Sequence, residues 1–331
     1  MMETNAHLDA DIPRLDEFRK RRQQLTLTSR EFVEGFVPPD YLVDGLMQRR
    51  FVYSLTARTG GGKTAIALFL SAQLARGLPF GAHDVDPGRI LYLAGENSDD
   101  VRMRWIAMGE ALGYDPAELD VQFIDGRPSI EQVVSRVAAE CPHLDLVVVD
   151  TAVAYFDGTD ENDNVQMHAY AVKLRELSTL PGLPTVLVLC HPVKNAGNDN
   201  LVPRGGGGFL NEMDGNFAAR LKDGVIDMHW QGKFRGRDFE AISFQITPLT
   251  CETLKDSKDR PIHTVMVKPL SDADRAAVEQ KVRRDEDEIL VVLGNSFSGS
   301  QADLATTLGW FHTSGLPAKI TGTQSPAKPP G

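Results

Sequence analysis

Short apolar runs alternate with longer stretches of helical spacing along the first two thirds of the chain. Five apolar runs lack a helical period and predict buried strands, at residues 51–56, 90–94, 121–124, 144–149 and 185–190. Four intervening stretches have the length and spacing of helices, at residues 65–76, 99–112, 129–139 and 165–178. This alternation predicts an α/β fold with a mostly parallel central sheet.

The pattern changes after residue 215. Residues 216–222, 225–230 and 239–246 read as antiparallel strands joined by two turns, Asp223-Gly224 and the basic stretch 232–237. A charged helical segment then begins near residue 271. We therefore expect antiparallel C-terminal strands followed by a small helical appendage.

The same patterns divide the chain into five parts. They are an N-terminal arm (1–35), a main domain (36–250), a linker (251–270), a helical segment (271–311) and a disordered tail (312–331). Within the helical segment, Ser300–Trp310 looks like the first helix and turn of a helix-turn-helix that lacks its second helix. The arm carries the basic run Arg19–Arg22, which predicts a solvated helix packing on a neighbouring subunit, with a DNA-binding arm as the alternative.

Composition narrows the class of protein. A chain of 331 residues with a formal net charge of -11 does not have a generally basic surface, so global charge does not support nucleic-acid binding, although a local basic channel is compatible with it. No apolar run approaches the ~20 residues of a membrane span. The three cysteines fit no metal-binding spacing and predict free thiols. We expect a cytoplasmic protein without membrane contact.

The stretch 57–64, Ala-Arg-Thr-Gly-Gly-Gly-Lys-Thr, connects a predicted strand to a predicted helix. Consecutive glycines allow backbone N–H groups to face an anion, and the helix N-terminus adds positive partial charge. This predicts a nucleotide-binding loop, although Ala57 replaces the first glycine of the usual pattern. Lys63 would reach the β- and γ-phosphates and the Thr64 hydroxyl would bind magnesium. The predicted nucleotide contacts are Thr59, Gly60, Gly61, Gly62, Lys63 and Thr64.

Three polar residues follow predicted strands, where open α/β sheets place ligand chemistry. Glu96 follows a strand expected beside the phosphate-loop strand and is the candidate base, or else an acid near a helix N-terminus. Asp150 is the predicted magnesium ligand, or a polar residue that closes its strand. His191 is the candidate γ-phosphate sensor, or a histidine bonded to the backbone.

Two later segments supply candidate cations. The polar loop Lys194–Gly208 contains Arg204 and four consecutive glycines, and it predicts a segment that is too flexible for a buried role and is ordered by a partner or ligand. The turn at 232–237 contains Lys233 and Arg235. It predicts either cations inserted into a neighbour's nucleotide site or a solvated hairpin tip.

In this order, the phosphate loop, Glu96, Asp150, His191 and the Lys233-Phe234-Arg235 turn resemble the RecA/DnaB-type ATPases, and in particular the RepA-like hexameric plasmid helicases. The resemblance covers about residues 36–246 and implies a RecA-like P-loop NTPase core that uses ATP and Mg²⁺. It implies the catalytic, magnesium-binding and sensing roles given above. It also implies that Arg204, or Lys233 with Arg235, acts in trans within a homo-oligomeric ring or filament, expected to be a hexamer.

The predicted function is ATP hydrolysis coupled to translocation or remodelling on single-stranded DNA, as in a replicative helicase-like ATPase of a plasmid or mobile element. One alternative is a nucleotide-switched regulatory or DNA-binding protein without motor activity. Another is a small-molecule kinase, which also uses a phosphate loop, but the sequence shows no acceptor site for its substrate.

Overall fold

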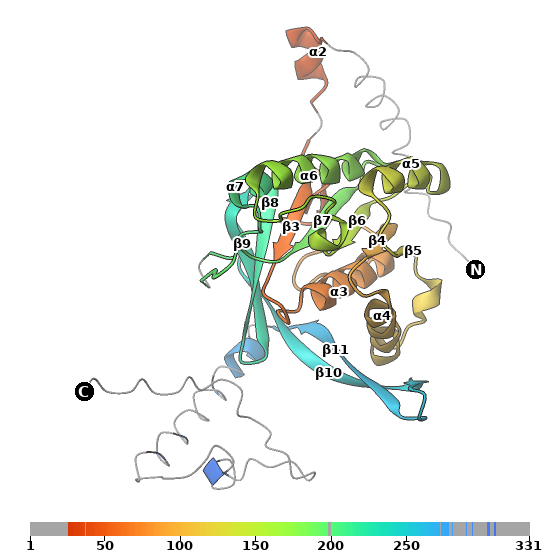
Figure 1. Ribbon diagram of the computed structural model, residues 1–331, viewed down its shortest axis with the longest axis vertical. Coiled ribbons are helices and arrows are strands. Elements are labelled where there is room, and N and C mark those ends of the chain that lie inside the picture. The colour runs from red at the N-terminus through yellow and green to blue at the C-terminus, as the bar shows by residue number, and fades with distance from the viewer. Residues whose placement is uncertain are drawn as a thin grey trace.

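The computed structural model describes residues 26–36, 38–197, 200–271 and 273–277, with residues 280, 289, 293, 303, 304 and 308. Its body is a large sheet with helices on both faces (Figure 1). The sheet strands are β3 (Val52–Thr56), β4 (Ile90–Ala94), β5 (Val121–Asp125), β6 (Leu146–Asp150), β7 (Thr185–Cys190), β8 (Gly215–Lys222), β9 (Val225–Phe234), β10 (Ile242–Lys255) and β11 (Pro261–Pro269). Two short strands, β1 (Tyr41–Val43) and β2 (Met47–Gln48), pair separately.

The order across the sheet is β11-β10-β9-β8-β3-β7-β6-β4-β5. The six strands from β8 to β5 pair in parallel, with β3 between β7 and β8. The remaining pairs, β8 with β9, β9 with β10 and β10 with β11, are antiparallel. This confirms the predicted fold class, a mostly parallel α/β sheet with antiparallel C-terminal strands.

Helices cover the two faces of the sheet separately (Figure 1). One face carries α3 (Lys63–Arg76) and α4 (Ser98–Leu112), and the other carries α5 (Ile130–Glu140), α6 (Asn164–Glu176) and α7 (Gly206–Leu210). The short elements are α2 (Ser29–Glu34), η1 (Pro116–Glu118), η2 (Ala152–Tyr155) and η3 (Leu177–Thr179). A capping box starts α5, since Ser129 and Gln132 exchange hydrogen bonds there.

The two helical layers enclose two apolar cores, one on each face of the sheet. In β6, Leu146 and Val148 belong to the core that includes α3, whereas Val147 and Val149 belong to the core that includes α6. Successive side chains of a strand point to opposite faces, so a strand covered on both faces is apolar at every position. This explains why the sequence of β6 has no polar alternation.

Residues 251–270, predicted to be a linker, instead form the end of β10 and the whole of β11. This hairpin contacts α3 and α4, and it buries Cys251, Met266 and Val267. The Glu110 side chain on α4 accepts hydrogen bonds from the Thr253 hydroxyl (2.7 Å) and the Glu252 amide (3.2 Å). Pairing with β11 and packing on two helices extend a strand that was expected to end at residue 246.

Two loop predictions also need correction. The glycines at 205–208 are not a flexible loop, because Gly206 begins α7 and Gly205 is buried. A Cβ on Gly208 would lie 2.3 Å from the Asn164 carbonyl oxygen, so these glycines permit close packing on α6. The basic turn is also shorter than predicted, since Lys233 lies within β9 and the turn begins at Arg235.

Several predictions fall outside the described residues. They concern the basic run Arg19–Arg22, the helix-turn-helix-like stretch Ser300–Trp310, of which only residues 303, 304 and 308 are described, and the tail after residue 311. The three cysteines are free and buried, as predicted. In the part of the chain that the structure describes, no helix is long and apolar enough to cross a membrane.

Candidate nucleotide-binding site

The glycine loop between β3 and α3 has the geometry of an anion-binding turn. Gly62 is the N-cap of α3 and has a φ of 83°, which favours glycine, and a Cβ there would lie 2.2 Å from the Ile226 side chain. The first helical hydrogen bond runs from the Ile66 N–H to the Gly62 carbonyl. The N–H groups of Lys63 and Thr64 precede it and are available to an anion at the helix N-terminus.

Lys63 is the first residue of α3 and is buried, with 7% of its surface exposed. Its Nζ donates to the carbonyls of Ala57 (2.8 Å) and Arg58 (3.2 Å). Burial lowers the pKa of this ammonium, and the nearby carboxylates of Asp150 and Glu96 oppose the shift. A phosphate bound at the loop would compensate a buried positive charge that now meets only neutral hydrogen-bond acceptors.

Asp150 ends β6 beside the start of α3. Its Oδ1 accepts a hydrogen bond from the Thr64 hydroxyl (3.3 Å), and its Oδ2 accepts one from the Tyr92 hydroxyl (2.7 Å). Burial raises the pKa of Asp150 to about 6. A hydroxyl and a carboxylate that face each other are oxygen ligands of the kind that Mg²⁺ prefers, so Thr64 and Asp150 fit a magnesium ion. The ion would supply charge neutralisation at the phosphates.

The candidate residues follow adjacent strands at the carboxyl edge of the sheet, in the order phosphate loop, His191, Asp150, Glu96. The prediction that Glu96 follows a strand next to β3 is wrong, because β7 and β6 lie between β3 and β4. Even so, the exposed side chain of Glu96 influences the pKa values of Lys63, Asp150 and His191. The backbone N–H groups of Gly95 (2.9 Å) and Glu96 (3.2 Å) donate to the Asp150 carbonyl. This holds the Glu96 backbone next to the end of β6.

Arg127, which no sequence motif marks, supports the Glu96 backbone from the other side. It follows β5, and its guanidinium donates to the carbonyls of Gly95 (2.5 Å) and Glu96 (3.4 Å). A single arginine after a strand is no motif, and its partners lie about thirty positions earlier in the chain. Sequence patterns therefore gave no signal for it.

His191 follows β7 and is half-buried. Burial lowers its pKa, and the charge of Lys63 lowers it further. Arg204 lies beside it, since the Arg204 N–H donates to the His191 carbonyl (3.0 Å) and the guanidinium contacts the Pro192 carbonyl and forms an ion pair with Glu161. A hollow of about 450 Å³ next to the phosphate loop is lined by Arg58, Thr59, His191, residues 192–196 and Arg204.

The structure therefore places Arg204 near the phosphate loop of its own chain. Lys233 and Arg235 lie elsewhere, at the amino edge of the sheet, where Phe234 pairs with Gly215 at the start of β8. The Lys233 Nζ donates to the Asn211 carbonyl (2.6 Å), and the Arg235 guanidinium contacts Asp214 (3.1 Å). These two cations do not contribute to their own chain's nucleotide site, and whether they or Arg204 act in trans stays a prediction.

The fold and the loop together define a phosphate-loop nucleotide-binding protein. The AAA domain family matches residues 18–197, which is more than half of the chain, and the chain belongs to this family. The matched region contains the phosphate loop, Glu96, Asp150 and His191, and membership indicates nucleotide-dependent ATPase activity. A comparison with curated proteins finds no match.

Proposed function

We propose that this protein hydrolyses ATP and couples hydrolysis to movement or remodelling on single-stranded DNA, as part of a homo-oligomeric ring or filament. The observation that carries the hydrolytic part is the shared sheet edge. A phosphate loop, two carboxylates and a histidine follow four adjacent strands there, and Lys63, Asp150, His191 and Glu96 influence one another electrostatically. Such an arrangement can bind a phosphate chain and activate water beside it.

In this proposal each residue has a defined role. The loop amides and Lys63 bind the phosphates, and Thr64 with Asp150 holds the magnesium ion. Glu96 orients the attacking water and accepts its proton, because it is exposed at the same edge and its backbone is fixed from two sides. His191 contacts the γ-phosphate.

The oligomeric part is supported by the cations at the opposite edge. Lys233 and Arg235 cannot act on the phosphate loop of their own chain, because the length of the sheet separates them. A neighbouring molecule that packs its amino edge against the carboxyl edge of this one would bring the two groups together. The DNA part is supported by the resemblance to RecA/DnaB-type ATPases.

The central experiment measures ATP hydrolysis by the purified protein with and without a single-stranded oligonucleotide. We expect turnover that requires Mg²⁺ and is stimulated by the oligonucleotide, and that is not stimulated by a duplex of the same sequence. Equal turnover with and without DNA would contradict the motor and favour a nucleotide-switched protein. Transfer of the γ-phosphate to a small molecule would identify a kinase.

Mixing two inactive variants tests the trans contact. A preparation of Glu96→Gln lacks the base, and one of Arg235→Ala lacks the candidate finger. If the finger acts in trans, subunits that mix at random form some sites with both residues intact, so the mixture regains turnover that neither preparation has alone. The control mixes Glu96→Gln with Lys63→Ala, which affects the same site. A mixture that stays as inactive as its components would contradict the shared site.

A further inference from the structure

The fully buried side-chain amide of Asn216 connects the strand before the phosphate loop to the loop that carries His191 and Arg204. Asn216 lies in β8 with no exposed surface. Its Oδ1 accepts hydrogen bonds from the hydroxyls of Ser54 (2.8 Å) and Thr56 (2.6 Å). Its Nδ2 donates to the carbonyls of Leu201 (3.0 Å) and Gln231 (3.1 Å). The side chain thus uses two donors and both acceptor positions, which is the full capacity of a primary amide.

Leu201 is held at both of its backbone polar atoms. Its carbonyl accepts from Asn216, and its N–H donates to the Oε1 of Gln231 (2.7 Å). Its side chain is also buried, with 2% of its surface exposed. Leu201 is therefore a fixed point in a loop whose tip, at residues 194–197, lies at the surface.

Backbone hydrogen bonds connect the segment after Leu201 to the segment that carries His191. The two limbs of the loop pair with each other, because the Val193 N–H donates to the Val202 carbonyl (3.2 Å) and the Arg204 N–H donates to the His191 carbonyl (3.0 Å). Since Leu201 directly precedes the returning limb, anchoring it sets where both limbs lie above the sheet.

The other side of the amide faces the phosphate loop. Thr56 is the last residue of β3 and directly precedes Ala57, and it binds the same Asn216 side chain that holds Leu201. An apolar residue would fill this core position without the cost of burying an amide, so the amide is suited to fixing geometry between elements rather than to packing alone.

We propose that Asn216 is a positioning residue of the nucleotide site, and that it sets the distance between the phosphate loop and the loop that carries His191 and Arg204. The inference rests on the proposed hydrolysis of ATP. It assigns Gln231 the supporting role of holding the Leu201 N–H. Neither residue contacts the nucleotide, so both act through the loop.

The test compares Asn216→Asp and Gln231→Met with two matched controls. Asn216→Asp keeps an acceptor for Ser54 and Thr56 but turns a carboxylate oxygen toward two carbonyls. Gln231→Met removes the acceptor for Leu201, whereas the control Gln231→Glu keeps it. The second control, Ser54→Ala, removes one bond to the amide without touching the loop.

We expect both test variants to lower kcat by roughly tenfold or more, as small displacements of a catalytic geometry do. KM for MgATP should change little, because the phosphate loop is intact. Hydrogen exchange of the peptide 192–204 should be faster in both test variants than in the wild type. Gln231→Glu and Ser54→Ala should match the wild type in kcat and in exchange of this peptide.

Three results would overturn the positioning role. One is a folded Gln231→Met variant with wild-type kcat and wild-type exchange at 192–204. Another is an equal loss of kcat in Gln231→Met and Gln231→Glu. The third is a loss in Ser54→Ala as large as in Asn216→Asp. A wild-type protein that does not hydrolyse ATP would refute the proposed function instead, and the exchange of peptide 192–204 would still decide whether Asn216 and Gln231 anchor the loop.

Discussion

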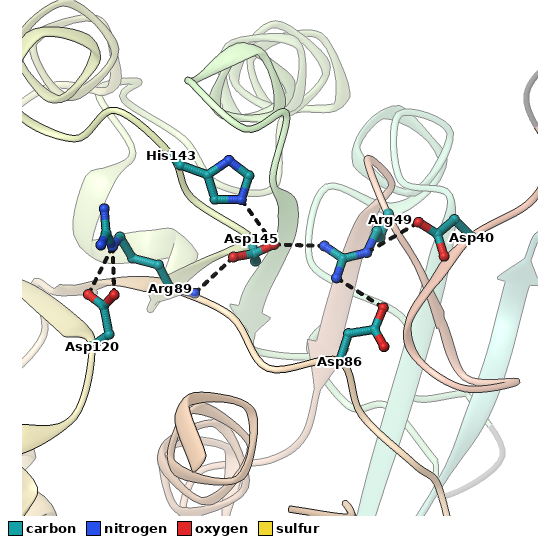
Figure 2. A network of polar contacts seen from close by, with 7 residues as sticks. All are labelled: Asp40, Arg49, Asp86, Arg89, Asp120, His143 and Asp145. Carbon is teal, nitrogen blue, oxygen red and sulfur yellow. Dashed lines mark hydrogen bonds and ion pairs between the residues drawn. The ribbon is translucent and has the colours of Figure 1, made fainter. Parts of the chain in front are cut away.

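The two ends of strand β6 carry buried aspartates in opposite chemical situations. Asp145 immediately precedes the strand at the amino edge of the sheet and is 5% exposed. It accepts hydrogen bonds from the Arg49 guanidinium (2.7 Å) and the Arg89 amide (2.9 Å), and His143 lies 3.3 Å away (Figure 2). Burial alone would raise its pKa, but the contacts with His143, the Arg89 amide and Arg49 outweigh burial and lower it.

Asp150, at the other end of the same strand, is 2% exposed and binds only neutral hydroxyls among its hydrogen-bond partners in the described residues. Burial accordingly raises its pKa to about 6. Its charge is therefore poorly compensated by the fold itself. The folded protein tolerates this cost, which is the usual sign of a functional rather than a structural carboxylate.

The difference between Asp145 and Asp150 shows how to distinguish a structural carboxylate from a functional one. Arg49 also forms ion pairs with Asp86 (3.2 Å) and Asp40 (3.4 Å), so Asp145 is the buried centre of a network that connects three segments of chain (Figure 2). A buried charge paired by its own chain is compensated within the fold and costly to unpair, whereas a charge left unpaired is available to a ligand.

The largest effect is expected on catalysis from Asp150→Asn. Turnover should fall at least about a hundredfold, because the variant removes the charge that would hold magnesium. Its free energy of unfolding at pH 7, measured with urea in the presence of EDTA, should equal or exceed that of the wild type, since a buried and poorly compensated charge is gone. If Asp150→Asn turned over ATP as fast as the wild type, Asp150 would not belong to the catalytic site.

Asp145→Asn should have the reverse effect. It leaves the Arg49 guanidinium without its buried partner, and breaking such a pair typically costs about 3 kcal/mol of unfolding free energy. Turnover per folded molecule should not change. Urea unfolding and ATPase assays on the same preparation check both statements. A stable but inactive variant would contradict the assignment of a structural role to the amino edge and a catalytic role to the carboxyl edge.

The pH dependence of stability should differ between the two aspartates. Because the pKa of folded Asp150 is raised to about 6, the folded protein binds a proton that the unfolded chain does not bind between about pH 6 and 4. Asp150 therefore destabilises the fold above pH 6, by up to about 3 kcal/mol at 1.36 kcal/mol per pKa unit, and this cost disappears as the pH falls toward 4.

For Asp145 the sign is opposite. Its lowered pKa stabilises the fold above the unfolded value, and this contribution is lost as the pH falls through the folded pKa. Metal-free urea unfolding of the wild type and Asp150→Asn at pH 7 and pH 5 is the measurement. The stability advantage of Asp150→Asn should shrink at pH 5. An advantage that is the same at both values would show that Asp150 does not titrate in this range.

The smallest effect is expected from Asp86→Asn. Asp86 binds the same arginine as Asp145, but its side chain is 58% exposed, and exposed pairs contribute less than about 1 kcal/mol. Urea unfolding should therefore separate it clearly from Asp145→Asn. Equal losses in the two variants would mean that the network acts through Arg49 rather than through the buried carboxylate.

Much of the fold follows from local patterns. The run Leu146–Val149 and the capping box at Ser129 specify a buried strand and a helix start, because their signals lie within a few residues. The hairpin of β10 and β11 could not be predicted, since it depends on pairing and on packing against α3 and α4. The strand order that separates β4 from β3 is likewise a property of the whole sheet.

The candidate site likewise contains some residues that local patterns predict and others that only the folded structure places. The phosphate loop is a contiguous motif, and Glu96, Asp150 and His191 stand at strand ends, so the sequence identifies all of them as candidates. Arg127 acts through partners 31 and 32 positions away, and the partners of Asn216 lie between 15 and 162 positions away, so no spacing rule reports such contacts. The edge on which Lys233 and Arg235 lie is known only once β8 and β9 are placed.

A hydrolytic site at the carboxyl edge is tested most directly by steady-state hydrolysis of MgATP by the wild type and by Glu96→Gln. The exchange removes the candidate base and leaves the phosphate loop, Asp150 and the network around Asp145 intact. We expect Glu96→Gln to unfold like the wild type and still bind ATP, and its turnover to fall at least about a hundredfold. Turnover equal to that of the wild type would contradict a hydrolytic site at the carboxyl edge.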